Sequence, residues 1–157
     1  MPRGASRSRI IGKLEQLNPL ARRMALALFL SFPKFKRRLE ILNSGDFRAD
    51  IRAPKGSKIY GVSVSTLHGE QTYVQFGVPN AFYPIDSEKE LLQILKGLLA
   101  DRLKFAIKEK KGKWTDTTLV RKPGDLVLNR GEIGRIYSWS GSKDSSVSPK
   151  PNIRSHK

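Results

Sequence analysis

The segment from Ser87 to Leu103, SEKELLQILKGLLADRL, carries the strongest folding signal in the sequence. Ser87 and Glu90 form a capping box, in which the hydroxyl accepts a hydrogen bond from the first turn and the carboxylate reaches back to the cap. Seven leucine and isoleucine residues follow, mostly at spacings of three and four, which predicts an amphipathic helix. Such a wide apolar stripe must be buried, so we expect this helix to pack against a sheet or other helices.

Strands are predicted on the N-terminal side of this helix, because the apolar period changes from about 3.6 to 2 at Asp46. Alternation over residues 47–52 predicts one strand. Residues 58–66 and 70–78 predict a hairpin that turns at Leu67-His68-Gly69, with Tyr60 on the same face as Val62. Residues 79–84 are expected to form a loop in which Phe82 and Tyr83 anchor to the core.

Further strands are predicted after the helix. Phe105 and Ile107 begin one strand, residues 110–113 turn it, and residues 114–120 return. Residues 135–140 read as a final strand. The predicted fold class is therefore α+β, with a mostly antiparallel sheet packed on the long helix and a short-helical region before it.

The N-terminal region, residues 10–45, has the spacing of three short helices. The first covers residues 10–17, Asn18-Pro19 caps the second, and residues 35–42 suggest the third. The second contains the apolar run Met24 to Phe32, which is nine residues long, whereas a membrane span needs about 20. We expect this run to be buried; an exposed surface for a partner or a membrane is the alternative.

The ends of the chain are basic and poor in apolar residues. Residues 1–9 predict a flexible basic arm, with an organelle presequence as the alternative, and residues 142–157 predict a disordered basic tail. The expected organisation is thus an arm (1–9), a helical region (10–45), an α+β domain (46–141) and a tail (142–157).

The charge balance indicates the class of partner. Thirty Lys and Arg residues oppose 14 Asp and Glu, a formal charge of +16, which favours polyanions such as nucleic acid, an anionic membrane surface or an acidic protein. The absence of cysteine excludes disulfides, thiolate metal sites and a cysteine nucleophile. It also fits a reducing compartment, so we expect a cytoplasmic protein that needs no metal or cofactor.

Two basic clusters are candidate anion-binding sites, because lysines can neutralise phosphates and an adjacent aromatic ring can stack on an unpaired base. The first lies in the hairpin after the long helix and comprises Lys108, Lys110, Lys111, Lys113, Trp114, Arg121 and Lys122. The second brackets the apolar run and comprises Arg22, Arg23, Lys36, Arg37 and Arg38, together with Lys34. The structural alternatives are a solubilising hairpin tip, a core Trp114 and a solvated rim around a buried helix.

Catalysis has little support in the sequence. Of the two histidines, His156 lies in the tail and His68 in a turn without an Asp or Ser at a pairing distance along the chain, so no triad is readable. The carboxylates show no metal-ligand spacing. We therefore favour a non-enzymatic protein, and a metal-independent ribonuclease that uses His68 with a nearby Lys or Tyr is the catalytic alternative.

The order of elements from Ile59 to Ser140, with VSVST, the long helix, KGKWTDTTLV and RIYSWSG, resembles small bacterial α+β proteins. Several of those are uncharacterised or suspected immunity proteins that neutralise a toxin. The resemblance implies a protein-interaction module, although an inhibitor of a nuclease is expected to be acidic so as to mask a basic cleft. The function expected from the sequence is non-catalytic binding of nucleic acid or another polyanion, with an immunity-type module as the alternative.

Overall fold

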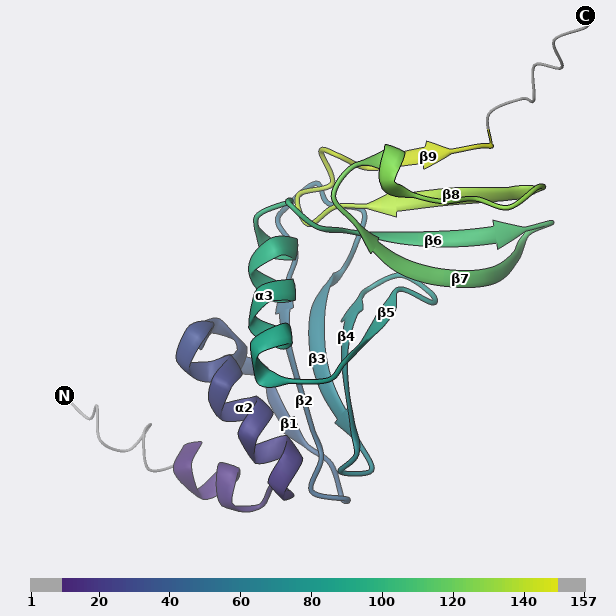
Figure 1. The fold of residues 1–157 in the computed structure, drawn as a ribbon. Helices are drawn as coiled ribbons and strands as arrows, with labels where there is room; N and C mark the ends of the chain where they lie inside the picture. The colour runs from purple at the N-terminus through teal and green to yellow at the C-terminus, as the bar shows by residue number, and fades with distance from the viewer. Residues whose placement is uncertain (1–9, 150–157) are drawn as a thin grey trace, which may run out of the picture.

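The fold consists of two antiparallel sheets with helices on one face of the first sheet (Figure 1). The structure is a computed structural model and describes residues 10–149. Strand order is β1-β2-β3-β4-β5 in the first sheet and β7-β6-β8-β9 in the second. The α+β class expected from the sequence is confirmed. The expected arm and the end of the tail, residues 150–157, lie outside the described residues.

The N-terminal region begins with helical residues 10–15 and continues as α2 (Pro19–Ser31) and the 3-10 helix η1 (Pro33–Arg38). The Asn18 side chain caps α2 by accepting a hydrogen bond from the Ala21 N–H at 2.9 Å. The apolar run lies on α2, where Met24, Leu28 and Phe29 are buried. Leu26 and Leu30 are 44% and 80% exposed, so this run is core with one exposed edge.

The prediction of a third helix over residues 35–42 is wrong beyond Arg38. Residues Leu39–Ile41 form strand β1, which pairs with β2 (Phe47–Arg52) so that Leu39 lies opposite Ala49. Pairing with β2 satisfies the backbone groups of this three-residue segment, and such a distant partner is invisible in local apolar spacing.

The predicted hairpin is confirmed as β3 (Gly61–Leu67) and β4 (Gln71–Phe76). Val62, Val64 and Val74 point to the buried face. Tyr60, expected beside Val62, is instead 66% exposed, because β3 begins only at Gly61. The expected loop 79–84 is also partly wrong, since β5 (Phe82–Ile85) pairs with β4.

Helix α3 (Glu88–Leu99) starts where the capping box predicts, with the Ser87 hydroxyl accepting from the Glu90 N–H at 3.1 Å. Its apolar stripe, including Leu91, Leu95 and Leu98, is buried. The helix ends near Ala100, however, because Asp101 adopts a left-handed φ of 54°. Leu103, predicted to extend the stripe, folds back against Gly97, where an added Cβ would lie 2.6 Å from the leucine side chain.

The second sheet follows α3 and carries a small core of its own. Its strands are β6 (Lys104–Lys110), β7 (Lys113–Val120), β8 (Glu132–Tyr137) and β9 (Ser145–Val147), with the 3-10 turn η2 (Pro123–Asp125) between β7 and β8. Ala106, Val120, Leu126 and Ile136 form the small core. Strand β9 pairs with β8, so the prediction of disorder is wrong for residues 145–147.

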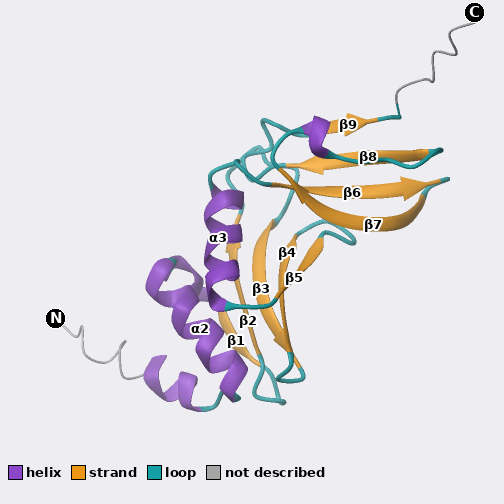
Figure 2. Ribbon diagram, viewed as in Figure 1, coloured by secondary structure: helices purple, strands orange, loops and turns teal. Residues whose placement is uncertain are grey.

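The main core joins the two sheets. Buried side chains of α2, α3 and the first sheet pack together with Phe105 and Ile107 of β6. The rings of Phe76 and Phe105 lie 4.4 Å apart between centroids. From this junction the β6–β7 hairpin extends away from the helices (Figure 2).

A buried carboxylate ties α2 to the first sheet. Asp46, 1% exposed, accepts hydrogen bonds from the Asn18 amide at 3.0 Å, the Ser44 hydroxyl at 2.5 Å and the Gly69 N–H at 3.0 Å. Burial by itself would raise the pKa of Asp46, but these hydrogen bonds outweigh it and lower the pKa to about 2. Ionised Asp46 therefore stabilises the native state.

Replacing Asp46 by Asn should remove a pH-dependent part of the stability. Because the folded pKa lies below the unfolded value of 3.8, the contribution is complete above about pH 4 and is lost as the pH falls towards 2. The free energy of unfolding should be higher for the wild type than for Asp46→Asn at neutral pH. This difference should be about 2 kcal/mol larger at neutral pH than in strong acid. Urea unfolding across this range measures the difference, and a pH-independent difference would contradict the assignment.

Candidate nucleic-acid interface

Two arginines of the N-terminal basic cluster, Arg22 and Arg23, are engaged within the protein. The Arg22 guanidinium donates to the carbonyl oxygens of Leu14 and Glu15 at 3.1 and 2.9 Å, where the first helical segment ends. Arg23 forms an ion pair with Glu88 of α3 at 2.9 Å. These arginines therefore have packing roles that the sequence did not reveal.

The cations of η1 divide between paired and solvated groups. Arg38 pairs with Asp50 at 3.0 Å, and hydrogen bonds to Asp50 and Tyr60 raise the pKa of Arg38. Lys34 and Arg37 are exposed and Lys36 is half-buried. Arg38 also lines a cavity on the outer face of the first sheet.

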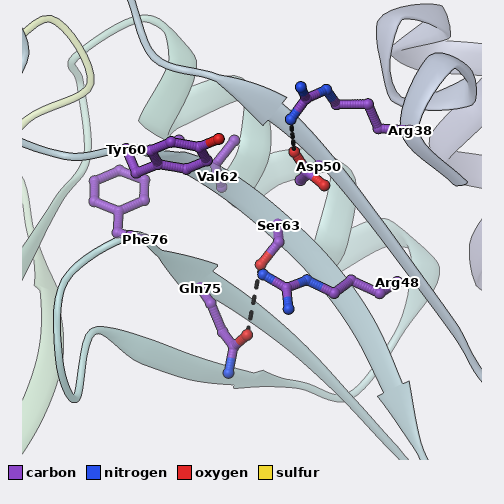
Figure 3. A pocket seen from close by; sticks show the side chains of 10 residues that line it. Arg38, Arg48, Asp50, Tyr60, Val62, Ser63, Gln75 and Phe76 are labelled. Atoms are coloured by element: carbon purple, nitrogen blue, oxygen red, sulfur yellow. Dashed lines mark hydrogen bonds and ion pairs between the residues drawn. The ribbon is translucent and has the colours of Figure 1, made fainter. Parts of the chain in front are cut away.

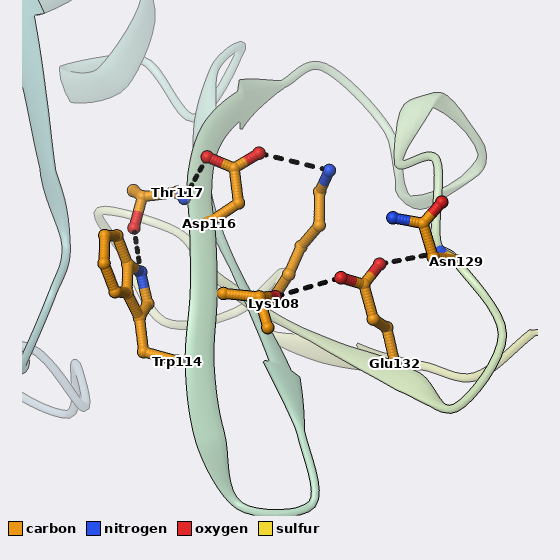
Figure 4. Close-up of polar contacts among 7 residues, drawn as sticks. Lys108, Trp114, Asp116, Thr117, Asn129 and Glu132 are labelled. Atoms are coloured by element: carbon orange, nitrogen blue, oxygen red, sulfur yellow. Dashed lines mark hydrogen bonds and ion pairs between the residues drawn. The ribbon is translucent and has the colours of Figure 1, made fainter.

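The hairpin cluster is split between the two ends of β7. Lys110, Lys111 and Lys113 are exposed at the tip, whereas Arg121 and Lys122 follow the other end. A strand of eight residues spans about 25 Å, so these groups form two surfaces. Lys108 is held by Asp116 at 3.2 Å, and Glu132 accepts from the Thr115 hydroxyl and the Asn129 N–H nearby (Figure 4).

Trp114 is 44% exposed and belongs to a row of aromatic rings that crosses from one sheet to the other. Its ring lies 6.1 Å from that of Phe82 on β5, which lies 6.2 Å from that of Tyr73 on β4. The indole N–H donates to the Thr117 hydroxyl, which in turn donates to the Asn80 carbonyl oxygen. We call Tyr73, Phe82 and Trp114 the aromatic row.

A trench runs along the first five residues of β3 on the outer face of the first sheet, because the residues that point outward there are small. Gly61, Ser63 and Ser65 alternate with buried valines. Gly61 cannot be replaced without strain, since a Cβ would lie 2.3 Å from the Ile51 carbonyl oxygen. Longer side chains on β2 and β4 rise on both sides, so the smallest side chains form the floor.

The register places the two walls of the trench. Arg48, Ser65 and Tyr73 lie in one cross-strand row, and the next row contains Asp50, Ser63, Gln75 and Phe82. Arg38 and Tyr60 close one end around a cavity of about 280 Å³ (Figure 3). The trench thus has Arg48 and the Arg38–Asp50 ion pair along its β2 side, and the aromatic row continues beyond its β4 side.

The polar groups of the trench are suited to a planar ligand with hydrogen-bonding edges. Ser63 is 7% exposed and its hydroxyl lies 3.5 Å from the Gln75 amide oxygen. Arg48 is exposed and takes no part in the ion pairs found among residues 10–149. The side chains of Gln75, Ser63 and Arg48 therefore line the trench together and can offer hydrogen bonds to a ligand.

Sequence reasoning found Trp114 and Arg38 but missed Arg48, Ser63, Tyr73 and Gln75. The one available signal is the segment GVSVS, in which Gly61, Ser63 and Ser65 place small residues at successive outward positions of a strand.

Metal binding and membrane crossing find no support in the part of the chain that the structure describes. No three His, Asp or Glu side chains within residues 10–149 converge as metal ligands. His68 is exposed in the β3–β4 turn, at a left-handed φ of 54°. Over the same residues, no helix has the length and apolarity to cross a bilayer.

The fold and this face define an α+β protein with an open, polar and aromatic sheet surface. Comparison with family models, curated proteins and solved structures finds no match for this chain.

Removing the central ring of the aromatic row should expose its neighbour. Phe82→Ala should destabilise the protein by only about 1 kcal/mol, because Phe82 is 36% exposed and the ring pairs add little more. In a Trp139→Phe background Trp114 is the only indole, so its emission should shift to the red and acrylamide quenching should increase. Unchanged quenching would show that Phe82 does not shield Trp114.

Proposed function

We propose that this protein is a non-catalytic nucleic-acid-binding protein and that it binds unpaired bases on the outer face of the first sheet. The observation that carries the proposal is the trench on β3. It lies between the aromatic row and the guanidinium of Arg48, which forms no ion pair with the described residues. Proteins that bind single strands combine cationic groups for the backbone with aromatic side chains for the bases.

The shape of this surface favours single strands over duplexes. Bases inside a duplex are already stacked and present only their edges, whereas splayed bases can lie on aromatic rings. The rings of the aromatic row have their polar atoms satisfied within the protein, since Tyr73 donates to the Gln71 side chain and Trp114 donates to Thr117. Their exposed area is therefore available for stacking.

The size and the polar lining of the cavity in the trench are suited to one base. A cavity of about 280 Å³ accommodates one planar ring system, and the Ser63 hydroxyl and Gln75 amide offer donors and acceptors to its edge. The formal charge of +16 provides long-range attraction for the phosphates. The three lysines at the β6–β7 tip directly precede Trp114 in the chain and add positive charge at that end of the aromatic row.

Single-stranded oligonucleotides should bind more tightly than duplexes of the same length in fluorescence anisotropy. Phe82→Ala should weaken binding by about 1–3 kcal/mol through lost stacking. Arg48→Gln should weaken it and reduce the slope of log K against log salt by about 0.7. Val127→Ala and Lys89→Gln are matched controls, because both residues are exposed outside the trench.

Equal losses in the controls, or binding that does not respond to salt, would refute the proposal.

Replacing Lys110, Lys111 and Lys113 together by Ala should flatten the salt dependence by up to about three charge units. These side chains lie at an exposed hairpin tip, so the triple variant should keep the thermal stability of the wild type. Anisotropy titrations at several salt concentrations measure the slope, and circular dichroism measures the stability. An unchanged slope would show that the hairpin tip is not part of the nucleic-acid interface.

The rival expected from the sequence, an immunity-type module, makes an opposite prediction. It requires a stoichiometric protein complex that survives nuclease treatment, with no dependence on Arg48 or Phe82. Pull-down from a nuclease-treated lysate, with and without these substitutions, separates the two functions.

A further inference from the structure

A second basic surface lies on the helix side of β5, away from the trench. It is a groove of about 1020 Å³ between α3, β5, the start of β6 and the end of β7. We call it the α3 groove. Its cationic lining residues are Lys96, Arg102, Lys104, Arg121 and Lys143, and its acidic ones are Glu90 and Asp101. Positive charge therefore outnumbers negative charge in this groove.

The two carboxylates of the α3 groove are already used by backbone groups. Glu90 accepts from the Asp86 N–H at 2.7 Å, and Asp101 accepts from the Ser140 N–H at 3.0 Å. None of the ion pairs found among residues 10–149 includes a cation of this groove. The described part of the chain therefore supplies no ion-pair partner for these cations.

Two of these cations have an additional local role. Lys96 lies in the last turn of α3 and Arg102 just beyond its end, where positive charge stabilises the helix C-terminus, and Arg102 donates to the Lys96 carbonyl oxygen at 3.5 Å. They do not by themselves indicate a binding site. The argument rests on Lys104 and Arg121.

Lys104 is unusual because it is only 5% exposed and has no acidic partner within residues 10–149. Its ammonium group donates to the Arg121 carbonyl oxygen. A lysine has three N–H donors, and a buried charge with one neutral acceptor is poorly compensated. The Arg121 side chain is exposed at the same groove, so an anion placed there could meet both cations.

We propose that the α3 groove binds phosphate groups, with Lys104 as the buried charge that they neutralise and Arg121 as the second contact. The groove has room for more than one phosphate in a row. The phosphates belong either to a compact phosphorylated compound or to the backbone of a nucleic acid. This site is independent of the proposed function, because it lies on the other face of β5 and contains none of the trench residues.

The test uses tripolyphosphate and the full chain in isothermal titration calorimetry. The wild type should bind it saturably, and Lys104→Met should weaken binding about tenfold or more, as expected for a lost charged hydrogen bond. Met keeps the length of the buried side chain. Arg121→Gln changes an exposed group and should also weaken binding, so the test does not depend on the folding of one variant.

Lys89→Gln is the matched control, because Lys89 lies on α3 outside the groove and is exposed. No saturable binding by the wild type would overturn the proposal. Equal affinity in the wild type, Lys104→Met and Arg121→Gln would also overturn it, as would an equal loss in Lys89→Gln.

Titrating the same variants with a single-stranded oligonucleotide distinguishes the two sources of the phosphate. If Lys104→Met and Arg121→Gln weaken both titrations, the groove holds backbone phosphates. If they weaken only the tripolyphosphate titration, the groove holds a separate phosphorylated compound; both results support the site. Failure of the proposed trench would appear in Arg48→Gln and Phe82→Ala and would leave the tripolyphosphate result unchanged.

Discussion

The contact between Phe76 and Phe105 joins the two sheets, and the surface features that are built from both sheets depend on this junction. Their rings lie 4.4 Å apart within the shared core. With this junction set, β7 passes beside β5, and the Thr117 hydroxyl can donate to the Asn80 carbonyl oxygen. Trp114 then comes to lie against Phe82. An aromatic surface made from two sheets therefore requires the correct packing of one buried pair of rings.

The parts of the fold that the sequence predicts are those with a strong local signal. The start of α3 follows from Ser87 and Glu90, and β3 and β4 follow from alternation around a tight turn. The short strands β1, β5 and β9 were missed because three or four residues carry no usable period and gain their stability from partners elsewhere in the chain. The trench could not be predicted for the same reason, since the register of three strands brings Arg48, Ser65 and Tyr73 together.

Basic residues that look equivalent in the sequence have different tasks in the structure. Arg22 and Arg23 join helices, and Lys108 is held by Asp116, so these cations contribute to packing within the protein. Arg48 and the lysines of the hairpin tip form no ion pairs among the described residues and are available for an anion. Counting charge along the chain therefore locates basic segments but does not separate structural cations from binding ones.

The short outer strands also affect how copies of this chain meet one another. An exposed sheet edge offers unpaired backbone groups to the edge of a second molecule, and long flat edges promote aggregation. In the described part of the chain, β1 and β9 form two of the sheet edges with three residues each, and the edge at β5 lies beside β7. The open face of the first sheet can thus stay accessible while its borders resist pairing between molecules in a crowded solution.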